Sequence, residues 1–224
     1  MSHDRWRDEL HEARSDRGRL VALLSHGVPT DGLQLAGSAL LAAGPSAEFG
    51  DVIAELVESL RDRGCLGDVE LATALTERAA GRPSSHTVLA VDLDDLADLL
   101  DAHTSSESYI DLSSGVVWPG EIIDLGQGPD DLDPGHTGRW LFVGGEGSQL
   151  AYADMERFIA TVEPDALSVK LRDAINGKHP FKAFLTVLQR HDEQFTSWHR
   201  HRDDARIGRA RHWLAERGFA PART

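Results

Sequence analysis

The stretch WHRHRDDARIGRARHWL, residues 198–214, has the pattern of a long helix that anchors a fold. Trp198 and Trp213 stand near its two ends, and arginines recur between them at steps of three and four residues. Such steps place side chains on one face of a helix. We therefore predict one helix from about residue 193 to residue 216, in which both tryptophans are core anchors and Arg202, Arg206, Arg209 and Trp213 share a face.

This arginine face has two interpretations. Guanidinium groups beside aromatic rings suit the binding of an anionic partner. The same groups suit internal ion pairs with acidic side chains, such as those of Asp203 and Glu216 or of the rest of the fold. The sequence leaves both interpretations open. The candidate binding residues include one lysine from the preceding helix, and they are Lys182, Trp198, Arg202, Arg206, Arg209 and Trp213.

Charge is unevenly distributed along the 224 residues, whose formal net charge is −14. Residues 1–164 contain 11 basic and 30 acidic side chains, a balance of −19, whereas residues 165–224 contain 12 basic and 7 acidic ones, a balance of +5. All three lysines lie in the second segment. A basic segment on an acidic protein either packs against the acidic body or offers a surface to an anionic partner.

The first third of the chain predicts helices. Glycine and proline punctuate residues 1–81, and the apolar side chains between them recur at helical steps. Asp68 stands where the cap of the last of these helices is expected. The sequence RPSS at residues 82–85 is the best linker, so we expect a helical N-terminal unit over 1–81 and a second unit over 86–224.

The middle of the chain changes period. Residues 109–118, YIDLSSGVVW, predict a hairpin that turns at Gly115, and residues 139–143, RWLFV, predict another strand. Two parallel strands need a crossover connection of a dozen or more residues between them, and most of these segments are too short to contain one. The expected fold class is α+β, with the helical N-terminal unit, a small, mainly antiparallel β-sheet in the middle, and C-terminal helices.

Composition excludes several classes of protein. The single cysteine, Cys65, cannot form an internal disulfide, which suggests a reducing cytoplasm. The apolar runs are far shorter than the roughly 20 residues that a bilayer span requires. The first residues are charged and lack the apolar core of a signal peptide. We therefore expect a cytoplasmic protein that has no membrane partner.

No motif predicts a cofactor or a metal. The glycine-rich residues 144–148 lack the lysine of a phosphate-binding loop and the third glycine of a dinucleotide-binding one. The acidic loop 124–138 does not keep calcium-loop spacing, and His199 and His201 lie two residues apart, so a helix projects them in different directions. We predict no cofactor and leave open a metal-assisted hydrolase that uses this loop and nearby histidines.

Four stretches together resemble uncharacterised protein family 0158 of bacteria, in the form found in actinobacteria. They are YIDLSSGVVWP (109–119), DMERFIATV (154–162), LRDAINGKHPFKAF (171–184) and the long C-terminal helix. The resemblance extends over roughly residues 50–220 and leaves the first 45 uncovered. It implies a fold but no activity, substrate or cofactor.

The chain departs from this family's pattern in one place that bears on binding. Two adjacent arginines usually stand in the connection before the long helix, and here they are Lys182 and Ala183. An anion site built on those arginines would be weaker in this chain, whereas the fold keeps Phe181 and Phe184.

The leading hypothesis is a non-catalytic, cytoplasmic binding or regulatory protein. Its basic, aromatic C-terminal helices would bind an anionic macromolecule, either nucleic acid or an acidic protein surface. The alternatives are the metal-assisted hydrolase and an interaction or inhibitor module that recognises a protein through the N-terminal helices.

Overall fold

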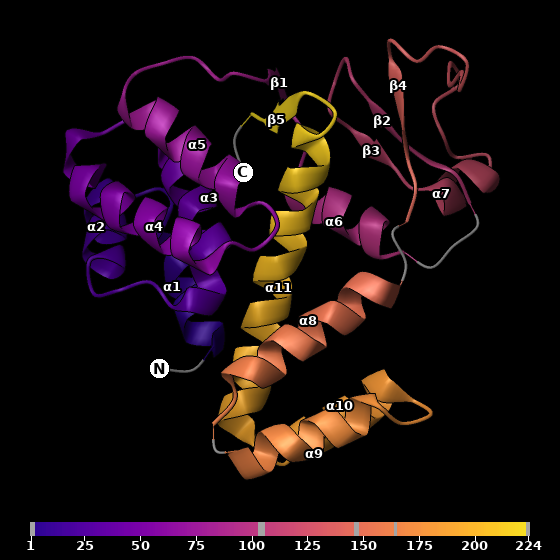
Figure 1. Cartoon of the computed structure of the whole chain (residues 1–224). Helices are drawn as coiled ribbons and strands as arrows, with labels where there is room; N and C mark the ends of the chain where they lie inside the picture. The colour runs from indigo at the N-terminus through magenta and orange to yellow at the C-terminus, as the bar shows by residue number, and fades with distance from the viewer. Residues whose placement is uncertain (1–2, 103–105, 146–147, 164, 223–224) are drawn as a thin grey trace.

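A computed structural model describes residues 3–102, 106–145, 148–163 and 165–222, and Figure 1 shows their arrangement. Helices account for 62% and strands for 8% of the structure, which confirms the α+β class. The first third is helical as predicted: α1 (His3–Ala13), α2 (Arg17–Leu24), η1 (Thr30–Gly32), α3 (Leu33–Ala43), η2 (Ala47–Phe49), α4 (Gly50–Arg63) and α5 (Asp68–Ala79).

The remainder alternates short strands with helices. Its elements are β1 (Thr87–Leu89), α6 (Leu93–Asp101), β2 (Ser108–Asp111), β3 (Val117–Trp118), α7 (Gly120–Asp124), β4 (Trp140–Val143), α8 (Ser148–Thr161), α9 (Asp165–Ile175), α10 (Pro180–Leu188), α11 (Asp192–Ala215) and β5 (Phe219–Pro221).

The strands form two small sheets. One is antiparallel in the order β3-β2-β4, with Tyr109 opposite both Trp118 and Phe142, which confirms the predicted hairpin and third strand. The other is a parallel pair in which β1 lies beside β5. Strand β5 was not predicted, because a strand of three residues is too short to have a recognisable periodicity. This pair joins the linker region to the last residues described.

Helix α11 is the axis of the molecule, and Figure 1 shows the other helices arranged along it. Two hydrophobic clusters meet this helix. The first half of α11 supplies Trp198 to a cluster formed with α8, α9 and α10. The second half supplies Ile207, Ala210, Trp213 and Leu214 to a larger cluster that contains the N-terminal helices, α6 and part of the central sheet. Residues 1–81 therefore share a core with the residues that follow the linker.

Two glycines let the N-terminal helices approach α11 at backbone distance. Gly67 has a φ of +82°, and a Cβ built on it would lie 2.2 Å from the carbonyl oxygen of Gly208. A Cβ on Gly208 would in turn lie 2.4 Å from the carbonyl oxygen of Leu66. Glycine is costly in the middle of a helix, and close backbone contact explains its presence at position 208.

None of the helices in the described residues combines the length and the apolar character that crossing a membrane requires.

Candidate functional site

The two tryptophans predicted as anchors are buried. Trp198 is 5% exposed, and its ring meets those of Phe158 and Phe184 edge-on at centroid distances of 5.4 and 4.8 Å. Edge-on aromatic pairs add about 0.5–1.5 kcal/mol each beyond the area they bury. Trp213 is 3% exposed and lies under the guanidinium of Arg217, 3.8 Å from the ring centroid. The two rings thus anchor α11 to its two hydrophobic clusters.

Two of the predicted binding arginines are engaged by carboxylates of neighbouring helices. Arg206 donates to Asp98 and, over 2.6 Å, to Asp101, both on α6. Arg209 donates to Asp101 over 2.9 Å and to the buried Asp154 on α8. The internal interpretation of the arginine face is the one that the structure shows for these two side chains, because their donors meet carboxylates of α6 and α8 in the same chain.

Arg202, the third predicted arginine, lies at the surface. Its Nη2 is 3.1 Å from Asp203, which also accepts from Arg7 of α1 over 2.5 Å. The Arg202 side chain is 44% exposed. Exposed ion pairs of this kind contribute little to stability, so Arg202 remains accessible but is partly neutralised by its neighbour.

A buried polar network that sequence reasoning missed fixes the middle of α11. Arg63 donates to Asp68 over 2.6 and 2.9 Å and to Asp204 over 2.6 Å. Gln34 connects the two acids, because its backbone N–H donates to Asp204 over 2.7 Å and its side-chain amide donates to Asp68 over 2.9 Å. Asp68, predicted as a helix cap, is the first residue of α5, and its carboxylate serves this network.

Two members of the network, Arg63 and Asp204, have shifted pKa values. Burial raises the pKa of Asp204 to about 6, although Arg63 and the backbone N–H groups of Gln34 and Leu35 favour its charged form. Burial lowers the pKa of the Arg63 guanidinium. The hydrogen bond to Asp68 and the charges of Asp68 and Asp204 outweigh burial, so the pKa of Arg63 is raised. Arg63 therefore stays charged, whereas Asp204 changes its charge near pH 6.

A cavity of about 920 Å³ lies beside this network, between η1, the end of α4, α8 and α11. Arg63 and Arg200 reach it, and each is already paired: Arg63 with the network acids, and Arg200 with Asp31 of η1. His201 also reaches it, and burial lowers the pKa of this imidazole. Asp62 and Arg157 also line this cavity and take part in no salt bridge within the described residues, so among its arginines only Arg63 and Arg200 are paired there.

Exposed cations that have no salt bridge in the described residues also occur singly elsewhere, as at Arg61 and Arg157, but they are concentrated on the hairpin formed by α9 and α10, the α9–α10 hairpin (residues 165–190). Five exposed cations lie on it: Lys170, Arg172, Lys178, Lys182 and Arg190. Within the described ranges of the chain, none of the five takes part in a salt bridge. In Figure 1 the hairpin projects from the start of α11, away from the N-terminal helices.

The packing of the α9–α10 hairpin explains why its cations face outward. Its apolar stripes, which include Leu171 and Phe184, enter the cluster around Trp198. A helix that buries one stripe leaves its other side chains to water. Two apolar side chains are left among the cations, Val169 at 52% and Phe181 at 39% exposure. The hairpin surface is therefore basic with an accessible aromatic ring.

The acidic loop 124–138 uses its carboxylates locally. Asp124 accepts from Ser106, Asp131 from Arg139 over 2.5 Å, and Asp133 from the backbone N–H of Gly135. Across the part of the chain that the structure describes, no group of three or more histidine, cysteine or acidic side chains is placed to hold a metal ion. In the glycine-rich stretch 144–148, Glu146 and Gly147 lie outside the described residues.

Similarity to known proteins adds the family. A family model described as "Uncharacterised protein family (UPF0158)" matches residues 87–224, more than half of the chain. The chain belongs to this family. A UPF0158 protein of Pseudomonas aeruginosa is 28% identical over 138 residues, which cover 60% of this chain and 87% of the relative. No solved structure matches the chain.

The UPF0158 match contains the α9–α10 hairpin and all of α11, whereas the N-terminal helices precede it. Of the residues predicted for binding, Lys182 alone lies on the hairpin. The other four hairpin cations, Lys170, Arg172, Lys178 and Arg190, were not among the predicted binding residues. One signal could have found the two lysines among them: all three lysines of the chain fall in this hairpin, outside its apolar stripes.

Proposed function

We propose that this UPF0158 protein binds nucleic acid through the α9–α10 hairpin. The observation that carries the proposal is the contrast in pairing: Arg206 and Arg209 are neutralised inside the fold, while the five hairpin cations are exposed and have no salt bridge among the described residues. Cations without internal partners are available to phosphate groups, which supply most of the affinity in nonspecific nucleic-acid binding.

The charge of the whole chain would orient such a partner. Residues 1–164 carry a balance of −19 and repel a polyanion, whereas the hairpin contains five basic residues against Asp165 and Asp173. Surface potentials of opposite sign steer an incoming polyanion toward the basic patch. We therefore expect binding at the end of the molecule that the hairpin occupies and strong sensitivity to salt.

An exposed aromatic ring favours a single-stranded nucleic acid over an acidic peptide. Phe181 lies next to Lys182 on α10, so a base can stack on the ring while the lysine meets its phosphate. Proteins that bind single strands combine such rings with a basic surface, and stacking contributes about 1–3 kcal/mol per base. Of the residues usual at this connection in the family, this chain keeps the aromatic residue, as Phe181, and one cation, as Lys182. Ala183 replaces the second arginine.

Fluorescence anisotropy with a labelled single-stranded oligonucleotide of about 20 nucleotides tests the proposal. We expect the double variant Lys178→Glu/Lys182→Glu to bind at least about tenfold more weakly at 50 mM salt, because two phosphate contacts become repulsive. The matched control is Arg61→Glu/Arg82→Glu, which changes the net charge equally at two exposed arginines outside the hairpin.

Two outcomes would overturn the proposal. Equal loss in both double variants would show that net charge matters and the hairpin does not. Binding of a glutamate-rich peptide to the hairpin, with no binding of the oligonucleotide, would identify an acidic protein segment as the partner.

A further inference from the structure

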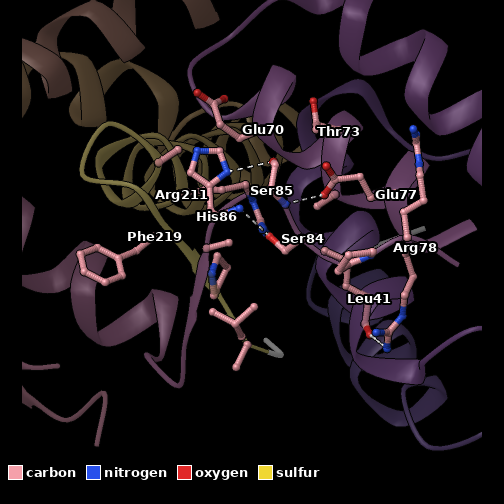
Figure 2. A pocket seen from close by; sticks show the side chains of 18 of the residues that line it. Leu41, Glu70, Thr73, Glu77, Arg78, Ser84, Ser85, His86, Arg211 and Phe219 are labelled. Carbon is pink, nitrogen blue, oxygen red and sulfur yellow. Dashed lines mark hydrogen bonds between the residues drawn. The ribbon is translucent and has the colours of Figure 1, made fainter. Parts of the chain in front are cut away.

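A second cavity, of about 520 Å³, lies at the other end of α11 from the α9–α10 hairpin, between α5, the linker 80–86, the β1–β5 pair and the end of α11. Its volume falls in the range of about 300–1,000 Å³ that is usual for small-molecule sites. Figure 2 shows Glu77, Ser84, Ser85 and His86 in the middle of the view, with Arg78 on one side and Phe219 on the other. The cavity depends on the parallel strand pair, because β5 supplies one wall.

Much of the cavity wall is apolar. Val69 of α5 is 66% exposed and Val88 of β1 is 56% exposed, and both line the cavity. Phe219 and Pro221 of β5 complete the apolar part. Large apolar side chains left in contact with water around a concave site favour a ligand with an apolar body.

Three arginines line the same cavity, and none of them pairs with a carboxylate in the described residues: Arg78, Arg82 and Arg211. Arg78 makes one long hydrogen bond, of 3.4 Å, to the carbonyl of Leu41, and its buried Nε has no partner. Arg82 is exposed. Because one guanidinium carries five N–H donors, Arg78 and Arg82 both have donors left for an acceptor that enters the cavity.

Arg211 adds a buried positive charge to this wall. It is 3% exposed and donates to neutral acceptors, Gln34 over 3.1 Å and Ser38 over 2.7 Å. Burial lowers the pKa of its guanidinium to about 10, and the charges of Glu70 and Asp204 limit the change. The wall around Arg211 therefore favours a negative charge nearby.

The acidic residues of the cavity have other partners. Glu70 is 2.7 Å from His212, and Glu77 accepts from the backbone N–H of Ser85 over 3.4 Å. Glu216 lies 3.6 Å from His212 and 3.7 Å from Arg217. These contacts leave the arginines as the polar groups that have the most unused capacity for hydrogen bonds.

We propose that this cavity is a binding site for a small organic carboxylate with an apolar body. Its carboxylate would accept from Arg78 and Arg82, and its apolar part would cover Val69, Val88 and Phe219. A guanidinium group binds a carboxylate through two parallel hydrogen bonds, which gives the site a preference for this end group over a hydroxyl. The site is separate from the hairpin and does not depend on nucleic-acid binding.

Isothermal titration calorimetry with octanoate as the probe, and octan-1-ol as its neutral counterpart, tests this site on the full chain. We expect octanoate to bind at least tenfold more tightly than octan-1-ol. In Arg78→Gln/Arg82→Gln, octanoate affinity should fall at least tenfold while octan-1-ol affinity stays within twofold. Arg61→Gln, an exposed arginine outside the cavity, is the control and should bind both probes as the wild type does.

A second variant keeps the test informative if loss of Arg78 disturbs α5. Arg82→Gln changes only an exposed side chain and should weaken octanoate binding about threefold without altering the melting temperature. Absence of octanoate binding to the wild type overturns the proposal. So does octanoate binding that neither arginine variant weakens.

Discussion

The two halves of the basic C-terminal segment use the same charge in opposite ways. In α11, Arg206 and Arg209 point at acids of α6 and α8 and are largely buried. In the α9–α10 hairpin, lysines and arginines point to water. Net charge per segment therefore does not measure how much charge a partner can reach, because pairing inside the fold removes part of it.

Side-chain chemistry agrees with this division. Arginine presents several donors in a rigid plane, so one guanidinium satisfies two carboxylates, as Arg209 does with Asp101 and Asp154. Lysine is a flexible, strongly hydrated point charge that is suited to phosphate at a surface. The three lysines occur only in the hairpin, and α11 contains none.

The largest expected effect concerns α11, the paired half of the segment, in which arginines pair with carboxylates. Replacement Arg209→Met should lower the free energy of unfolding by about 3–5 kcal/mol, because Asp154 is left buried without its cation. Urea denaturation measures the change. Arg202→Met, at the exposed end of the same face, is the control and should cost less than about 0.5 kcal/mol. Equal effects of the two replacements would abolish the distinction between paired and accessible arginines.

Stability in the paired half should depend on pH through Asp204. Its folded pKa of about 6 lies above the usual value of 3.8, so the folded state holds the proton more tightly than the unfolded state. The stability that this carboxyl contributes is therefore highest below about pH 4 and declines as pH rises to about 6. The decline should be on the order of 2 kcal/mol, since one pKa unit is about 1.4 kcal/mol.

Urea denaturation of the wild type and of Asp204→Asn at pH 4, 5, 6 and 7 isolates this contribution. The wild-type advantage over the variant should shrink as pH rises from 4 to 6. The control, Lys182→Gln in the hairpin, should leave the pH dependence unchanged. An advantage that grows over the same interval would contradict the assigned direction.

A smaller effect concerns the aromatic ring of the unpaired half. Phe181→Ser should weaken oligonucleotide binding about fivefold to a hundredfold, corresponding to one stacked base at about 1–3 kcal/mol. Phe181→Tyr keeps the ring and should bind within twofold of the wild type. Anisotropy titration measures the affinities of both variants, and equal affinities would exclude stacking on this ring.

Much of the fold could be predicted from local pattern. The long helix from about 193 to 216 is α11, and the hairpin that turns at Gly115 is β2–β3, because periodicity and turn chemistry are properties of neighbouring residues. The parallel pairing of β1 with β5 and the contact of Gly67 with Gly208 could not be predicted. Both join residues more than a hundred positions apart, and no local pattern records such contacts.

The candidate site was predictable only in part. The sequence located the basic segment and named Lys182, but it ranked the α11 arginines above the hairpin lysines. Helical spacing shows that Arg206 and Arg209 share a face; it does not show that Asp98, Asp101 and Asp154 lie opposite that face. Pairing is a property of the assembled fold, and the acids come from α6 and α8.

The dependence of oligonucleotide affinity on salt tests most directly whether the cations of the hairpin contact the phosphate groups. Each cation that meets a phosphate of a single strand contributes about 0.7 to the slope of log K against log salt concentration. The variant Lys170→Gln/Lys178→Gln/Lys182→Gln should therefore have a slope about 2 units shallower than the wild type. The same slope in both proteins would contradict the account and place the nucleic-acid contacts elsewhere.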